Sequence, residues 1–94
     1  MSADPRYIMI SDLISKGYIK SLRDIFEKGL ISRSKVARDL GLNPARFSRN
    51  LKEPERFILR DLYSLADLIG IKGIEILHLV GADMTKSKRG KKQR

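Results

Sequence analysis

The residues of this sequence with the most chemistry to offer are its cations. Twenty lysine and arginine residues stand against eleven aspartate and glutamate residues, which gives a net charge of +9. Guanidinium and ammonium groups bind phosphate, and arginine can also grip the O6 and N7 atoms of a guanine. The balance therefore indicates a polyanionic partner, nucleic acid first and an anionic membrane surface second.

Other kinds of chemistry have little support in the composition. There is no cysteine, which excludes thiolate zinc sites and a cysteine nucleophile, and His78 is the single histidine. No glycine-rich phosphate loop or nucleophile elbow occurs, so we expect no enzyme, no metal, no cofactor and no small-molecule substrate. No apolar run approaches the length of about 18 residues that a membrane span needs. We therefore expect no membrane partner and a cytoplasmic location, in a prokaryotic cytoplasm or nucleoid.

The positive charge is concentrated in two blocks. Residues 33–60 hold eight basic and three acidic residues, a net charge of +5, and residues 85–94 hold six basic residues and no acidic one. The segment between them, 61–84, has a net charge of −3. Because residues 85–94 contain no apolar side chain, we predict that they are disordered, either as a solubilising end or as a phosphate-binding arm.

Helix start and stop signals divide the rest of the chain. Asp4-Pro5 and Asn43-Pro44 each combine an N-cap with a proline at the first helical position, and Ser32 precedes a further helical stretch. No window alternates as a strand does, so the predicted fold is all-α, with five helices, or six if the N-terminal segment is helical instead of a short strand at 8–10. The predicted helices span about 5–17, 18–28, 33–40, 44–52 and 59–69, and the last begins near 73.

These helices predict a simple domain organisation. Residues 1–17 are expected to form an N-terminal extension, residues 18–84 the folded domain, and residues 85–94 the basic tail. Within the domain, Leu59 and Leu62 belong to one apolar side of the helix at 59–69.

The helices predicted at 33–40 and 44–52 are three residues apart, and their residue types fit a steep crossing. Ala37 offers a small side chain where the second helix passes over the first. Gly41 can leave the first helix with a positive φ without a Cβ clash, and Phe47 anchors the second helix on the core. This is the spacing of a helix-turn-helix.

The stretch SRSKVARDLGLNPARFSRNLKEP, followed by LRDLYSLADLIGIKGIEIL, resembles the Cro/repressor-type helix-turn-helix family, also called the xenobiotic-response-element type. The resemblance covers residues 32 to about 80. It implies a lambda-repressor-like bundle that binds double-stranded DNA, with residues of about 44–52 in the major groove. Asn50 departs from the family pattern, in which this position is usually aliphatic, and Leu51 is expected to take its packing role.

The resemblance also implies which side chains meet DNA. Arg49 suits a guanine or a phosphate, with a solvated surface charge as the alternative, and Asn43 suits adenine but more readily caps its helix. Ala45 can touch a thymine methyl or let the backbone approach, and Ser48 can bond a base or a phosphate. Phosphate contacts are expected from basic residues in and around the motif: Arg33, Lys35, Arg46, Lys52, Arg56 and Arg60.

A transcriptional regulator, of repressor type or from a mobile element or a toxin–antitoxin system, is the function that this resemblance implies. Family members mostly bind as dimers. The apolar residues of the last helix are therefore either a homodimer surface or ordinary core: Ile74, Ile76, Leu77, Leu79 and Val80. The alternative function is a protein-interaction module that keeps the fold without specific DNA binding, which the acidic segment 61–84 and Pro44 would suit.

Overall fold

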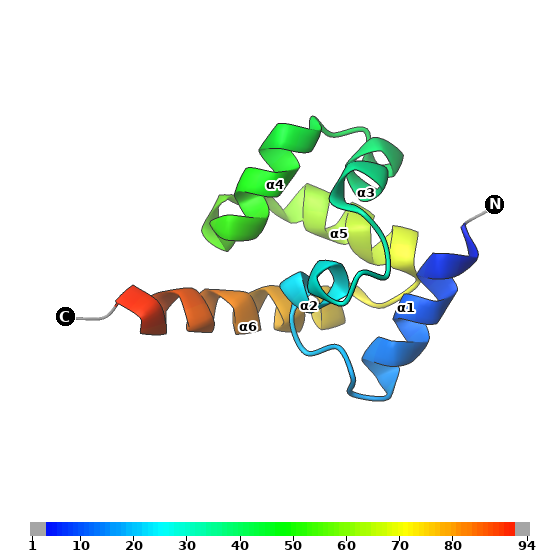
Figure 1. The fold of residues 1–94 in the computed structure, drawn as a ribbon, viewed down its shortest axis with the longest axis horizontal. Coiled ribbons are helices and arrows are strands. Elements are labelled where there is room, and N and C mark those ends of the chain that lie inside the picture. Colours follow the sequence, from blue (N-terminus) through cyan, green and yellow to red (C-terminus); the bar gives the residue numbers. More distant parts are fainter. Residues whose placement is uncertain (1–3, 92–94) are drawn as a thin grey trace.

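The computed structural model describes the backbone of residues 4–91 and the side chains of residues 4–85. Every regular element in that part of the chain is a helix, which confirms the predicted all-α fold (Figure 1). One short 3-10 turn, η1 (Pro54–Arg56), follows the fourth helix. The α-helices are α1 (Pro5–Ser15), α2 (Leu22–Glu27), α3 (Arg33–Leu40), α4 (Pro44–Lys52), α5 (Leu59–Ile69) and α6 (Gly73–Lys91).

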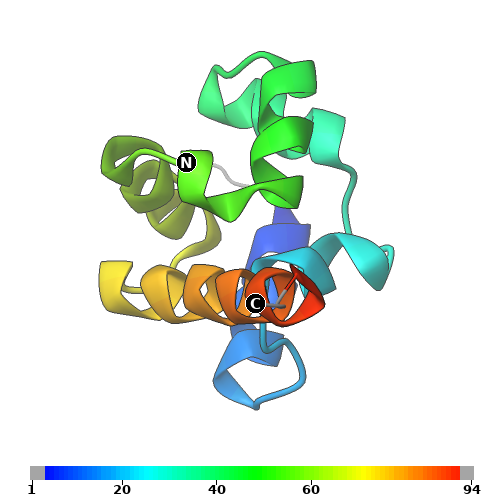
Figure 2. The same cartoon turned by 90° about the vertical axis from the view of Figure 1, so that its left-hand side faces the viewer.

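Helix α5 connects the parts of the bundle. It packs against α6, α3 and α1, while α2 packs on α6 and α4 packs on α3. The two views show α6 along one side of the molecule and the α3–α4 pair on the opposite side, with α1 distant from α4 (Figures 1 and 2). The core is filled by buried apolar side chains from all six helices and two loops: Tyr7, Ile10, Ile19, Leu22, Ile25, Ile31, Val36, Ala37, Phe47, Leu51, Leu62, Leu65, Ala66, Ile69, Ile76, Leu79 and Val80.

Side-chain caps define the helix starts that the sequence predicted. Asp4, Ser32 and Asn43 each accept a hydrogen bond from a backbone N–H two or three residues further on, at 2.9, 3.1 and 3.1 Å. These bonds satisfy N–H groups that a helix leaves unpaired in its first turn. The predicted starts of α1, α3 and α4 are therefore confirmed.

Two details of the predicted helices were wrong. Helix α2 begins at Leu22 and not near Tyr18, because Ser21 has an extended backbone and its Oγ caps the Asp24 N–H. Helix α5 has the predicted bounds, but Leu59 is exposed, since it lies in the first turn at the edge of the buried side.

Helix α1 is part of the bundle and not an extension of it. Tyr7 and Ile10 are buried in the common core, and α1 packs on α5. The predicted domain boundary at residue 18 was therefore wrong, and so was the strand alternative at 8–10. Helical geometry turns Ile8 outward and brings Tyr7 into the core instead.

Helix α6 continues beyond its predicted end. We predicted disorder in residues 85–94, but the helix extends through Lys91, and residues 92–94 lie outside the described part of the chain. Lysine and arginine are good helix formers, so they can prolong a helix that is anchored by its buried first turns. Ile76, Leu79 and Val80 are buried and close the core, whereas Ile74 of the same helix is exposed.

Candidate nucleic-acid interface

Helices α3 and α4 are joined by the tight turn that the sequence predicted. Gly41 ends α3 with a φ of 75°, a left-handed conformation that glycine adopts without strain. Apart from Gly41 and its two neighbours in the chain, no heavy atom of the described residues lies within 4 Å of a Cβ at this position, so the conformation and not the space requires glycine. The Leu42 N–H donates to the Ala37 carbonyl at 2.8 Å and closes the end of α3. Asn43 then uses its Oδ1 to cap α4.

One face of α4 is locked into the core. Phe47 is 0% exposed and makes edge-to-face contacts with Phe26 and Phe57, with ring centroids 5.9 and 6.0 Å apart. Leu51, one turn further on, is buried as predicted, and Asn50 is buried beside it. These contacts fix which side of α4 faces outward.

The opposite face of α4 forms an exposed stripe, which we define as Ala45, Arg49 and Lys52. Intervals of four and three residues place them on one side of the helix, roughly opposite Phe47. All three residues are exposed. The side chains of Arg49 and Lys52 make no hydrogen bond or ion pair with any residue whose side chain the structure describes. Their charges are thus available to an external anion.

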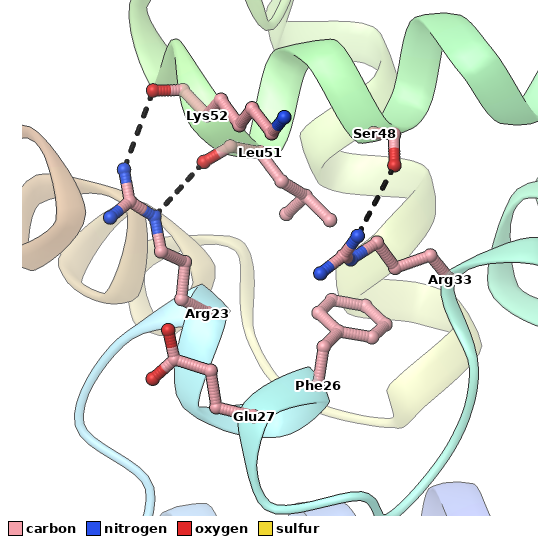
Figure 3. Close-up of a pocket in the computed structure, with 7 residues that line it drawn as sticks. All are labelled: Arg23, Phe26, Glu27, Arg33, Ser48, Leu51 and Lys52. Carbon is pink, nitrogen blue, oxygen red and sulfur yellow. Dashed lines mark hydrogen bonds between the residues drawn. The ribbon is translucent and has the colours of Figure 1, made fainter.

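Two further residues of α4 flank the stripe. The Arg33 Nη1 donates to the Ser48 Oγ at 3.5 Å, so the first residue of α3 meets the middle of α4 (Figure 3). On the other flank, Arg46 lies 3.5 Å from the carboxylate of Asp61 in α5. Asp61 Oδ2 is buried and accepts no hydrogen bond from the described chain, so the nearby guanidinium compensates its charge. Arg46 is therefore less available to a ligand than Arg49.

A groove lies between α2, the start of α3 and the Ser48 side of α4. A neighbouring depression reaches the N-terminus of α3, where Ser32 and Ser34 accompany Arg33. The free N–H groups of a helix start favour an anion, so Arg33 and this helix end together suit a phosphate. The groove is lined by three cations, one carboxylate, one hydroxyl and two apolar side chains (Figure 3): Arg23, Phe26, Glu27, Arg33, Ser48, Leu51 and Lys52.

Lys35 and Arg56, which were both predicted to contact phosphate, are neutralised by nearby carboxylates. The Lys35 Nζ lies 3.0 Å from Asp39 and 3.9 Å from Asp4, so this lysine faces α1 and not the exposed stripe. Arg56 forms an ion pair with Glu53 at the end of α4. Lys35 is therefore separated from the other predicted contacts, because it pairs with Asp39 of its own helix and with Asp4, the N-cap of α1, in a segment that was expected to lie outside the domain.

The residues around Lys35 form a polar contact between α1 and α3, which we call the α1–α3 junction: Asp4, Tyr7, Lys35 and Asp39. The buried Tyr7 hydroxyl donates to Asp39 Oδ2 at 2.7 Å. This bond and the one from Lys35 lower the pKa of Asp39, while burial raises the pKa of Tyr7. Hydrogen bonds from Arg6 lower the pKa of Asp4 to about 2. Both carboxylates are therefore ionised at neutral pH.

Arg23 is a residue of this region for which the sequence predicted no role. Its Nε donates to the Leu51 carbonyl at 3.1 Å and its Nη2 to the Lys52 carbonyl at 3.4 Å (Figure 3). A cation near a helix C-terminus often bonds the last carbonyls of that helix, but here the two carbonyls belong to residues that are 28 and 29 positions from Arg23 in the sequence. No local pattern connects the two.

Two further properties of the described chain bear on its function. None of its helices is long and apolar enough to cross a membrane. Within residues 4–85, no group of three histidine, cysteine or acidic side chains is arranged to hold a metal ion. In comparisons with known proteins, no protein-family model, no curated protein and no solved structure matches this chain.

Proposed function

We propose that this chain binds double-stranded DNA in a sequence-specific manner and acts as a small transcriptional regulator of the repressor type. In this proposal α3 and α4 form the helix-turn-helix of a lambda-repressor-like domain, and α4 enters the major groove. The observation that carries the proposal is the exposed stripe. Its two cations, Arg49 and Lys52, have no counter-charge within residues 4–85, and the buried Phe47 anchors their helix in the core. The resemblance of residues 32 to about 80 to the Cro/repressor type supports the same conclusion.

Each residue of the exposed stripe has a role in the proposed complex, and so do Ser48 and Arg33 on one flank of the stripe. Arg49 is central and can donate two parallel hydrogen bonds to the O6 and N7 atoms of a guanine. Ala45 is small enough to bring the helix close to the bases, and Lys52 reaches a phosphate at the end of the helix. Ser48 exchanges its contact with Arg33 for a base or a phosphate. Arg33 and the N-terminus of α3 then bind the DNA backbone.

The distribution of charge supports this orientation at longer range. The helix pair belongs to the segment 33–60, which has a net charge of +5, whereas the segment 61–84 has a net charge of −3. An asymmetric field of this kind turns the α3–α4 side of the molecule towards a polyanion and speeds the encounter.

Selection of bound sites from a random duplex pool tests the proposal. The wild-type chain is expected to enrich one sequence. Arg49→Ala should lower the affinity for that sequence roughly tenfold to hundredfold, because a bidentate guanine contact is lost, and should lower the affinity for unrelated duplex far less. Lys16→Ala, at the end of α1 and distant from α4, removes one charge as a matched control and should leave the enrichment unchanged.

Several outcomes would contradict the proposal. If the wild-type chain enriches no sequence, or if Arg49→Ala binds the same site as tightly, the alternative of a protein-interaction module takes its place. If binding is lost only on deletion of residues 86–94, the basic end acts as a nonspecific polycation and α4 is not the binding element. An inverted repeat among the selected sites would support a homodimer on DNA.

A further inference from the structure

Three helices meet at the Arg23 side chain, beside the end of α4. Asp83 of α6 is 1% exposed, and its Oδ2 accepts a hydrogen bond from the Leu22 N–H at 2.9 Å. Its Oδ1 accepts the Arg23 N–H at 3.4 Å and lies 3.9 Å from the Arg23 Nε. Asp83 therefore caps the first turn of α2 from another helix and places a negative charge beside the guanidinium.

From this anchor the guanidinium of Arg23 reaches the last turn of α4. Its donors bond the carbonyls of Leu51 and Lys52 (Figure 3). A helix has no N–H groups of its own left for these carbonyls, and the negative end of its dipole favours a cation. Arg23 supplies both the missing donors and the favourable charge.

This contact acts on the end of α4 that carries most of the exposed stripe. Lys52 is itself a member of the stripe, and Arg49 lies one turn before it. The other end of α4 is held separately by the Asn43 cap. Loss of the Arg23 contact would detach the last turn of α4 from α2 and α6 at this point, so the stripe would lose part of its fixed direction.

We propose that Arg23 is a positioning residue of the DNA interface. Asp83 holds Arg23, and Arg23 fixes the last turn of α4 so that Arg49 and Lys52 point towards the major groove of the DNA. Arg23 does not itself bind a phosphate. The inference rests on the proposed function. Its basis is that the guanidinium is already engaged by two carbonyls and a carboxylate, which a phosphate would have to displace.

Amide hydrogen exchange in the absence of DNA tests the positioning directly. Arg23→Met keeps an unbranched apolar stem but removes every donor, and Arg23→Lys keeps the charge beside Asp83 but not the forked geometry. Both variants should speed exchange of the Lys52 and Glu53 amides several-fold, the methionine variant more strongly, with the α1 amides unchanged. Lys28→Met is the control. Lys28 is the exposed C-cap residue of α2, the helix that carries Arg23, and its substitution should leave exchange in α4 unchanged.

Affinity measured against salt concentration separates positioning from phosphate contact. In a positioning role, Arg23→Met lowers the affinity for the preferred site about tenfold, as expected for losing a hydrogen bond to a charged group. The slope of log affinity against log salt then stays unchanged. If Arg23 instead contacts a phosphate, the slope becomes smaller by about 0.9.

The outcomes distinguish the two proposals. Faster exchange in α4 with an unchanged salt slope supports the role of Arg23. Unchanged exchange in α4, or a slope that falls by about 0.9, overturns it. A wild-type chain without sequence preference overturns the proposed function, and the exchange experiment still decides whether Arg23 orders α4. If Arg23→Met does not fold, as judged by thermal unfolding, Arg23→Lys provides the exchange measurement, and Arg23→Gln, which removes the charge but keeps a polar side chain, provides the salt slope.

Discussion

The exposed stripe on α4 and the α1–α3 junction both take their cations from the basic segment 33–60. The two regions differ in whether these cations have carboxylate partners. Lys35 in the junction lies 3.0 Å from Asp39 Oδ2, the same oxygen that accepts a hydrogen bond from the buried hydroxyl of Tyr7. Arg49 and Lys52 in the stripe have no such partner within residues 4–85.

This contrast shows that a cation can be assigned to ligand binding only when its neighbours in the folded structure are known. A lysine between two carboxylates has most of its charge neutralised and contributes to holding two helices together. A cation without a counter-charge interacts with whatever anion arrives from outside. We therefore expect substitutions in the junction to change stability, and substitutions on the stripe to change binding.

The largest effect is expected beneath the stripe, at its attachment to the core. Phe47→Ala removes the ring that packs on Phe26 and Phe57 and should lower the free energy of unfolding by about 3–5 kcal/mol in urea denaturation. Tyr63→Ala, at an exposed aromatic residue, is the control and should change it by less than about 1 kcal/mol. A smaller loss at Phe47 than at Tyr63 would mean that α4 is not held by its inner face.

A smaller effect is expected from opening the junction. Tyr7→Phe removes the hydroxyl that donates to Asp39 and should lower the free energy of unfolding by about 1–2 kcal/mol, because the carboxylate loses a donor. Tyr18→Phe, at an exposed tyrosine, should be neutral. The affinity of the folded variants for DNA should not change. If folded Tyr7→Phe binds DNA more weakly, the junction and the stripe are coupled.

The loss caused by Tyr7→Phe should itself depend on pH. Because the folded-state pKa of Asp39 is lowered, its stabilisation is present above the unfolded value of 3.8 and is lost as the pH falls through the folded value. Urea denaturation at about pH 7 and about pH 2 should therefore give a smaller Tyr7→Phe effect in acid. An equal effect at both values would contradict the role of Asp39 as acceptor.

The smallest expected effect gives the most direct contrast between the two regions. Lys52→Met and Lys35→Met each remove one charge from the basic segment, and each should change the free energy of unfolding by less than about 1 kcal/mol. Lys52→Met should reduce the slope of log DNA affinity against log salt by about 0.9, and Lys35→Met should leave it unchanged. Equal slopes for the two variants would mean that the field of the whole domain, and not the stripe, carries binding.

Local patterns were sufficient to predict most helices and the outward face of α4. The Ser32 and Asn43 caps and the positive φ of Gly41 define the α3–α4 pair as expected. The spacing of Phe47 and Leu51 then determines which residues of α4 face solvent. The predicted position of Arg49 on the outer surface follows from these features.

Local patterns did not predict the partner of each charge. Lys35 was expected at the DNA, but it meets Asp4 from a segment that was expected to lie outside the domain. Arg23 had no predicted role, and its acceptors in α4 become neighbours only when α2 and α4 pack together. Asp83 caps α2 from a position 61 residues beyond Leu22.

The order of amino acids alone was enough to specify where most helices begin and end and which way α4 faces, because caps, glycine conformation and apolar spacing act within a few residues of the chain. Packing determined that Lys35 is neutralised, that Arg49 is not, and that Arg23 holds the end of α4. Electrostatic partners are the groups that lie close in space. Apart from Asp39, which is four residues from Lys35, these carboxylates and carbonyls belong to segments that are remote in the sequence.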